Sequence, residues 1–198
     1  MNVAEVQRFA RQIALPEVGP DGQTRIGAAR VLVIGGGLVA ETAVSYLTAA
    51  GVGQVSARDV PPADGDAWLE ALSGVDLVVR AGFDDDAMLG AAKRLGLPVI
   101  VARATPAQVD VISFPRRAPA PDAPLEVPPQ AAASSAPGAA DLVAGTLAAA
   151  EALVRIAGVD GQVDEDHVDE GHVDKGRIRH LRLPLDGGAP LAQELGAS

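Results

Sequence analysis

Short apolar runs alternate with amphipathic stretches along residues 1–114 of this chain. Five runs rich in Val, Leu and Ile predict strands at Arg30–Ile34, Gln54–Arg58, Val75–Arg80, Leu97–Ala102 and Val109–Phe114. Helices are expected over residues 2–13, 21–29, 39–50, 64–72 and 84–95, several of them closed by a glycine. This alternation predicts an α/β fold, a Rossmann-like and mostly parallel sheet with helices on both faces.

The pattern changes in the second half of the chain. Residues 115–136 are rich in Pro, Ala and Ser, which predicts an extended linker rather than a helix or a central strand. An apolar stripe predicts a helix over Ala139–Ala157, residues 159–176 form a polar acidic loop, and Arg177–Leu185 alternates like an edge strand. We expect four parts: an N-terminal helical segment (1–30), a glycine-turn core (31–114), the linker (115–136), and a C-terminal part (137–198) that completes the same domain.

A glycine-rich turn joins the strand Arg30–Ile34 to the next helix. Gly35, Gly37 and Ala40 match the G-x-G-x-x-G/A spacing of nucleotide-binding βαβ units. Such glycines let a phosphate approach the amides at the helix N-terminus, and Asp59 follows about twenty residues later, where an acid that binds ribose is expected. The turn therefore predicts a nucleotide site, although the same glycines also suit a tight connection without a ligand.

Charge and composition narrow the class of partner. The net charge is −10 and the pI is about 4.6, so nucleic acid and anionic membranes would be repelled, and we expect a protein partner. Cysteine is absent, which excludes disulfides, thiolate zinc sites, thioesters and persulfide carriers. No apolar stretch is long enough to span a bilayer, and we expect a cytoplasmic protein.

Three short motifs surround the glycine turn. Residues 8–13 have the sequence RFARQI, residues 19–23 have GPDGQ, and residues 49–53 have AAGVG. In this order they resemble the opening of the ThiF/MoeB/HesA family, the prokaryotic relatives of ubiquitin-activating enzymes. The later strands and helices resemble that family more loosely, so that the resemblance covers residues 3–186 with gaps. It implies a ThiF-type Rossmann-like fold, shortened in the middle.

The resemblance also implies an activity. Family members bind ATP–Mg and adenylate the C-terminal glycine of a ubiquitin-like or sulfur-carrier protein, usually as dimers. In these dimers an arginine of one subunit reaches the ATP of the other, and Arg11 matches that arginine. Asp84 lies one residue from the position of the family's magnesium-binding aspartate. An active member would therefore be an ATP-dependent adenylyltransferase that uses Arg11, Asp59 and Asp84.

Departures from the family pattern suggest a different outcome. The family's D-x-D, with its following Asn, Arg and Lys, is replaced by Asp59-Val60-Pro61 and proline-rich sequence. Glu41 is expected in the first turn of the helix after the glycines, where a carboxylate repels phosphate. We therefore predict a catalytically degenerate member without cofactor or metal site, a non-catalytic partner in a homodimer or in a complex with an active relative or a sulfur-carrier or ubiquitin-like protein.

Two alternatives remain open. The first is an active ATP-dependent adenylyltransferase. The second is an NAD(P)-binding oxidoreductase, which rests only on the glycine pattern and Asp59.

Overall fold

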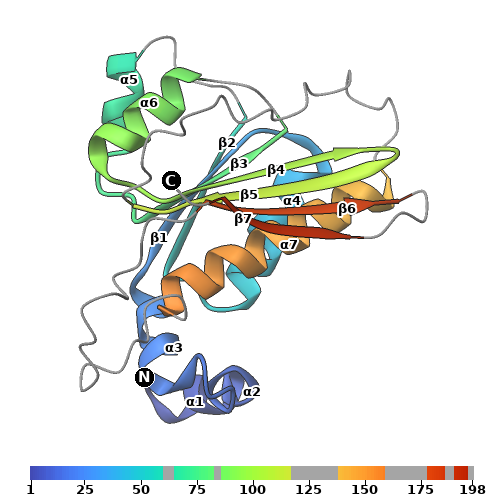
Figure 1. The fold of residues 1–198 in the computed structure, drawn as a ribbon. Coiled ribbons are helices and arrows are strands. Elements are labelled where there is room, and N and C mark those ends of the chain that lie inside the picture. Colours follow the sequence, from blue (N-terminus) through green and yellow to red (C-terminus); the bar gives the residue numbers. More distant parts are fainter. Residues whose placement is uncertain (60–64, 83–85, 117–137, 159–177, 186–189, 196–198) are drawn as a thin grey trace, which may run out of the picture.

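The computed structural model describes residues 1–59, 65–82, 86–116, 138–158, 178–185 and 190–195. In this part of the chain, seven strands form one sheet in the order β2-β1-β3-β4-β5-β6-β7 (Figure 1). Helices cover both faces of that sheet. The predicted α/β, Rossmann-like fold class is therefore confirmed.

The strands are β1 (Arg30–Ile34), β2 (Gln54–Arg58), β3 (Leu77–Ala81), β4 (Val99–Thr105), β5 (Gln108–Phe114), β6 (Ile178–Pro184) and β7 (Leu191–Leu195). The helices are α1 (Val3–Arg8), α2 (Ala10–Ile13), α3 (Gly19–Ala28), α4 (Gly37–Ala49), α5 (Gly65–Ala71), α6 (Asp86–Leu95) and α7 (Ala139–Ala157). β2, β1, β3 and β4 pair in parallel, whereas β5, β6 and β7 continue the sheet antiparallel. The carboxyl ends of the parallel strands therefore lie along one edge, which we call the carboxyl edge, and their starts lie along the opposite amino edge.

Alternation along the strands builds two separate hydrophobic cores. Val31 and Val33 of β1 face α4 and α7, whose small residues pack closely on the sheet. Leu32 and Ile34 face the other way, into a smaller core with Trp68 of α5 and the residues of α6. Because both faces of β1 are buried, its sequence is continuously apolar, as expected for a central parallel strand.

Gly145 allows α7 to pack against α4. A Cβ atom added at Gly145 would lie 2.5 Å from the Val39 carbonyl oxygen and 2.7 Å from the Thr42 Cβ. Gly145→Ala should therefore lower the free energy of unfolding by about 1–3 kcal/mol, as measured by urea denaturation. Gly90→Ala in α6 is the matched control, because nothing lies within 4 Å of its added Cβ. Helix propensity should make that variant more stable by up to about 1 kcal/mol. Equal effects of the two substitutions would contradict this packing role.

The structure corrects three sequence-based predictions. The helix expected over residues 2–13 is broken at Phe9, whose buried ring lies against Gly51 and whose backbone leaves the helix with φ −102° and ψ 14°. The helix after the glycine turn begins at Gly37 and not at Val39. The strand expected at Arg177–Leu185 is not an edge strand, because β7 pairs along its outer side.

The predicted linker and acidic loop lie outside the described residues, apart from Pro115 and Arg116 at the start of the linker. The division of the chain into four parts stays a prediction.

Candidate functional site at the carboxyl edge

The glycine turn lies at the topological switch point of the sheet, where the strand order reverses at β1. β2 follows β1 in the chain but lies on one side of it, and β3 lies on the other side. In doubly wound sheets, ligands bind in the crevice outside the carboxyl ends of the strands at such a switch point. The turn between β1 and α4 therefore occupies the position at which this fold places a ligand.

Gly35 connects the turn to both neighbouring strands. Its N–H donates a hydrogen bond of 2.8 Å to the Arg58 carbonyl oxygen at the end of β2. Its φ is +116°, and a side chain there would overlap the Ala81 carbonyl oxygen of β3. This position needs glycine for the fold itself, whether or not a ligand binds.

Gly36 and Gly37 differ from Gly35 because they face open space. Gly36 is the N-cap of α4 in an extended conformation, makes no side-chain capping bond, and has nothing within 4 Å of an added Cβ. Gly37 has φ +73° and equally open surroundings. The first amides of α4 are thus accessible to an anion, which the partial positive charge of the helix N-terminus would attract.

The prediction for Glu41 is wrong. α4 begins at Gly37, no acidic residue lies in its first turn, and Glu41 is exposed in the next turn. A solvated carboxylate there is largely screened by water, so it gives little repulsion to a phosphate at the turn. One of the arguments against nucleotide binding is thereby removed.

The structure brings together part of the predicted site. Asp59 directly follows β2 and is exposed at the same edge as Gly35 and Gly37. Ala40 is only 5% exposed and packs into the core, so its small size serves contact between helix and sheet. Asp84 lies outside the described residues.

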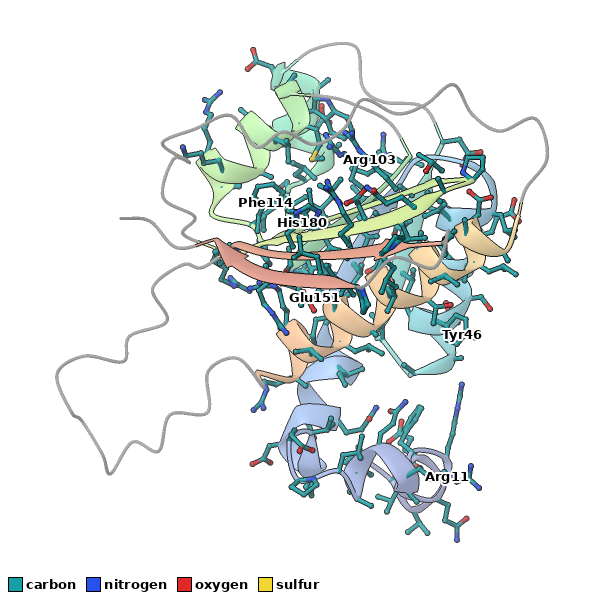
Figure 2. The ribbon with its side chains drawn as sticks, turned by 45° about the vertical axis from the view of Figure 1, so that its right-hand side comes forward. Arg11, Tyr46, Arg103, Phe114, Glu151 and His180 are labelled. Carbon is teal, nitrogen blue, oxygen red and sulfur yellow. The ribbon has the colours of Figure 1, made fainter. Side chains whose placement is uncertain are left out.

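Arg11 lies far from its own glycine turn. It is exposed on α2, in the helical segment that leads through α3 into the start of β1, whereas the turn follows the end of β1 (Figure 2). Any contact between Arg11 and a nucleotide would therefore be made in a second subunit.

Sequence reasoning missed a group of charged residues on the sheet face that α5 and α6 also cover. This charged strip consists of Arg80, Arg103, Asp110, His180 and Arg182, and it crosses four strands. Arg103 pairs directly with Asp110, and Asp110 pairs directly with Arg182, across neighbouring strands. Arg80 lies at the end of the predicted strand Val75–Arg80, whereas Arg103 lies just beyond the predicted strand Leu97–Ala102. The signal was available, because each arginine interrupts an otherwise apolar strand.

Asp110 lies at the centre of the charged strip. Its side chain is 4% exposed and accepts hydrogen bonds from Arg182 Nε (2.9 Å), His180 Nε2 (2.8 Å) and Gln108. Burial raises the pKa of Asp110, but the hydrogen bonds from Arg182, Gln108 and His180 outweigh burial and hold that pKa below its usual value.

The two inner arginines of the strip influence each other. Arg80 and Arg103 are 2% and 4% exposed. Burial and the nearby charge of Arg80 lower the pKa of Arg103, while Asp110 opposes that shift. Arg80 precedes Ala81, whose carbonyl oxygen lies close to Gly35, but alternation along β3 places the Arg80 side chain on the sheet face opposite to α4.

The described residues contain no group of three His, Asp or Glu side chains placed to hold a metal ion. They also contain no helix of the length and apolarity that crossing a membrane requires.

Comparison with known proteins finds a family match at this edge of the sheet. Residues 9–60, which include the glycine turn and β2, match the ThiF family model. The sulfur carrier protein adenylyltransferase of Thermus thermophilus is 49% identical over 51 residues, which are 26% of this chain and 19% of that protein. The matched stretch therefore spans about a fifth of that relative.

Solved structures agree in fold over a longer range. The whole chain superposes on 76% of PaaA with a TM-score of 0.71 and 14% identity. It also superposes on 73% of Escherichia coli MccB, solved with AMPCPP and MccA, with a TM-score of 0.62 and 12% identity.

Together, the fold and the edge define a Rossmann-like α/β protein with a nucleotide-type glycine turn. Residues 9–60 match the ThiF family, which agrees with the resemblance predicted from the sequence motifs.

Proposed function

We propose that this chain is an ATP-dependent adenylyltransferase that activates the C-terminal carboxylate of a small protein or peptide. The observation that carries the proposal is the open first turn of α4 at Gly36 and Gly37, beside Asp59 at the switch point of the sheet. The names of the relatives support this class of reaction, since one is a sulfur carrier protein adenylyltransferase.

Each group at the edge has a role in this proposal. The amides of Gly36 and Gly37 bind phosphate oxygens, and Asp59 accepts hydrogen bonds from the ribose. Arg80 and Arg103 add positive potential near the phosphates, where charge is redistributed during phosphoryl chemistry. The substrate carboxylate attacks the α-phosphorus, the bond to the bridging oxygen breaks, and pyrophosphate leaves. Magnesium bound with ATP would screen the phosphate charges, and Asp84 is its proposed ligand.

The partner and the assembly also belong to this proposal. The substrate class is a ubiquitin-like or sulfur-carrier protein, or a peptide such as the MccA that accompanies MccB. We further propose a dimer in which Arg11 serves the nucleotide of the other subunit, because Arg11 lies at the opposite end of β1 from its own turn.

One observation favours the second candidate, a non-catalytic binding partner. Arg80 and Arg103 expose very little surface, and Asp110 of the same strip is already bonded to His180 and Arg182. The charged strip would then hold the sheet together instead of a nucleotide. The replacement of the family's D-x-D by Asp59-Val60-Pro61 also favours a non-catalytic binding partner.

Binding and exchange assays separate the two candidates. If the chain is an adenylyltransferase, ATP–Mg binds saturably, and pyrophosphate exchange into ATP appears when a carrier protein with a C-terminal glycine is added. Asp59→Asn should weaken ATP binding by about 3–10-fold, because it removes charge from hydrogen bonds to the ribose. Asp76→Asn at the amino edge is the control and should leave binding unchanged. An absence of ATP binding by calorimetry would reject the enzyme and leave the binding partner.

A further inference from the structure

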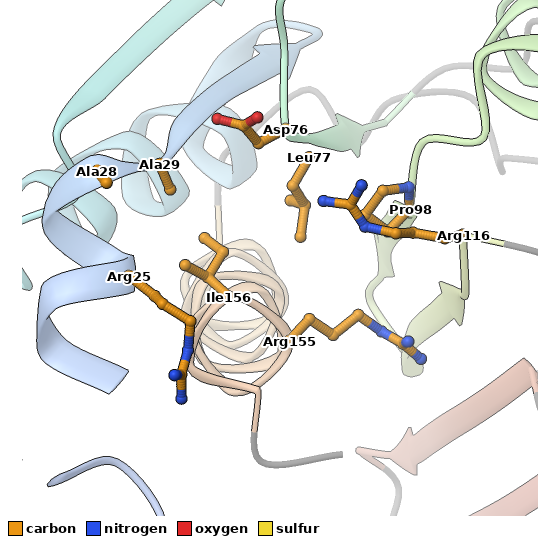
Figure 3. Close-up of a pocket in the computed structure, with 9 residues that line it drawn as sticks. All are labelled: Arg25, Ala28, Ala29, Asp76, Leu77, Pro98, Arg116, Arg155 and Ile156. Carbon is orange, nitrogen blue, oxygen red and sulfur yellow. The ribbon is translucent and has the colours of Figure 1, made fainter. Parts of the chain in front are cut away.

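A second concave site lies at the amino edge, on the opposite side of the sheet from the glycine turn. It is a cavity of about 330 Å³ between the starts of the central strands and the ends of α3 and α7 (Figure 3). Leu77 and Ile156 contribute to its apolar wall, and three arginines, Arg25, Arg116 and Arg155, stand around it. An apolar cavity with a few charged groups is the usual form of a small-molecule site.

Positive charge predominates in this cavity, although the whole chain carries a net charge of −10. Its one acidic lining residue is Asp76, whose carboxylate accepts hydrogen bonds from the Arg30 backbone N–H (2.8 Å) and Nε (3.4 Å). The charge of Asp76 is therefore balanced by Arg30, which is not a lining residue. Arg155 pairs with Glu151 at 3.7 Å, so Arg25 and Arg116 are the lining arginines whose charge no described carboxylate of the cavity balances.

Arg25 and Arg116 differ in how their guanidinium groups lie, because Arg25 is directed to the end of α7 and Arg116 extends toward Leu77 (Figure 3). Arg25 uses Nε (3.0 Å) and one terminal nitrogen on the Ala157 carbonyl oxygen, which leaves its other terminal nitrogen outside that contact. Arg116 is exposed, and it makes no ion pair with any residue in the described ranges. Figure 3 shows its guanidinium reaching over Leu77 from the side opposite Arg25.

Helix ends explain only part of this arrangement. Arg25 and Arg155 lie in the last turns of α3 and α7, where a positive charge stabilises the partial negative charge of the helix C-terminus. Arg155 also contacts the Ser113 hydroxyl. Arg116 follows β5, belongs to no helix and has no such role. Its position beside the cavity is the feature that helix capping leaves unexplained.

We propose that the amino-edge cavity binds a small organic anion, a carboxylate or phosphate group attached to an apolar body. Arg116 binds the charged group, Arg25 adds positive charge at the rim of the cavity, and the apolar body lies against Leu77 and Ile156. The site is separated from the glycine turn by the length of the parallel strands, so its ligand is distinct from the nucleotide of the proposed function. The inference goes beyond that function and does not depend on it.

Matched probes test this site directly. Benzoate and phenyl phosphate share one apolar body and differ in the anion, and benzyl alcohol is the neutral control. We expect both anions to bind saturably in an NMR titration, with shifts at the amides of Leu77 and Ile156, and the alcohol not to bind. A stronger effect of one anion will identify whether the site prefers carboxylate or phosphate.

Two variants of equal charge change locate the binding. Arg116→Gln should weaken anion binding by about 5–10-fold, because one charge-assisted hydrogen-bonding group is lost. Arg58→Gln, at the carboxyl edge, should change it by less than about 2-fold, since it is outside hydrogen-bonding reach of the cavity. Arg116 is exposed, so its substitution should leave the fold intact, which circular dichroism will verify.

Three outcomes would overturn the proposal: no saturable binding at millimolar probe, equal binding of the alcohol, or equal losses in the two variants. Saturation with ATP–Mg should leave probe binding unchanged. Displacement by ATP would place the probe at the carboxyl edge and would also overturn the proposal. Failure of the chain to bind ATP at all would count only against the adenylyltransferase.

Discussion

Gly35→Ala should lower the free energy of unfolding by about 3–5 kcal/mol, the largest effect expected from adding a single methyl group to this chain. Two physical causes add together at this position. The backbone has φ +116°, which strains any residue with a side chain, and the new Cβ would overlap the Ala81 carbonyl oxygen. Because that oxygen belongs to the neighbouring strand, relief would require β1 and β3 to separate.

Gly36→Ala is the matched control one residue later. Its backbone is extended, with φ −117° and ψ −178°, and nothing lies within 4 Å of the added Cβ. We expect its stability to stay within about 0.5 kcal/mol of the wild type, as for other substitutions away from structural constraints. The measurement is urea denaturation followed by circular dichroism for both variants. Equal stability losses in the two variants would contradict the conclusion that Gly35, and not Gly36, is required by the fold.

The same pair of variants bears on function. If a phosphate binds at the N-terminus of α4, the methyl group of Gly36→Ala will occupy its approach and weaken ATP binding while the fold is kept. A stable Gly36→Ala variant with unchanged ATP affinity would place the nucleotide elsewhere.

Asp110→Asn should cost about 3–5 kcal/mol of stability at neutral pH, the loss typical of breaking a buried ion pair from one side. The carboxylate accepts hydrogen bonds from Arg182, His180 and Gln108, and an amide nitrogen would face one of these donors. Arg103, directly opposite on β4, would lose the negative charge of Asp110, which favours its charged form. Asp76→Asn is the control, because its carboxylate is 39% exposed and its pair with Arg30 spans 3.4 Å. Exposed pairs of this kind contribute about 0–1 kcal/mol.

The pH dependence of the Asp110 effect has a defined sign. The pKa of Asp110 is lowered in the folded protein, so its carboxylate binds a proton less readily there than in the unfolded chain. Its contribution to stability is therefore fully present above the unfolded pKa of about 3.9, and it is lost as the pH falls through the lower folded value. The stability difference between wild type and Asp110→Asn should shrink in acid. A difference that stays constant between neutral pH and strong acid would contradict this assignment.

The two edges of the sheet are proposed to bind different ligands. The carboxyl edge has the glycine turn, Asp59 and the charged strip, where we propose that a nucleotide binds. The amino edge has the cavity with Arg25 and Arg116, which fits a smaller anion. If both proposals hold, β1 and β3 connect the anion site at the amino edge with the nucleotide site at the carboxyl edge.

Local patterns were sufficient to predict most elements of the sheet. β1 is buried on both faces, so its residues are continuously apolar and mark it as a central strand. Helix ends could also be predicted from the sequence, because Gly51, Gly74 and Gly96 adopt positive φ at or just after them. β7 was not predicted, because LAQEL has no clear alternation and its place is fixed by pairing with β6.

By itself, the sequence determined the fold class, the glycine turn and the resemblance of residues 9–60 to the ThiF family, because these depend on the order of residues over short distances. Only the tertiary structure decided what each part of the turn does. Gly35 touches a carbonyl of β3, while Gly36 and Gly37 stay open, and Glu41 points into solvent one turn later. Strand pairing also brings the residues of the charged strip together, since Asp110 and His180 are 70 residues apart and meet only across neighbouring strands. Contacts between residues so distant in the chain depend on sheet register, which no local pattern encodes.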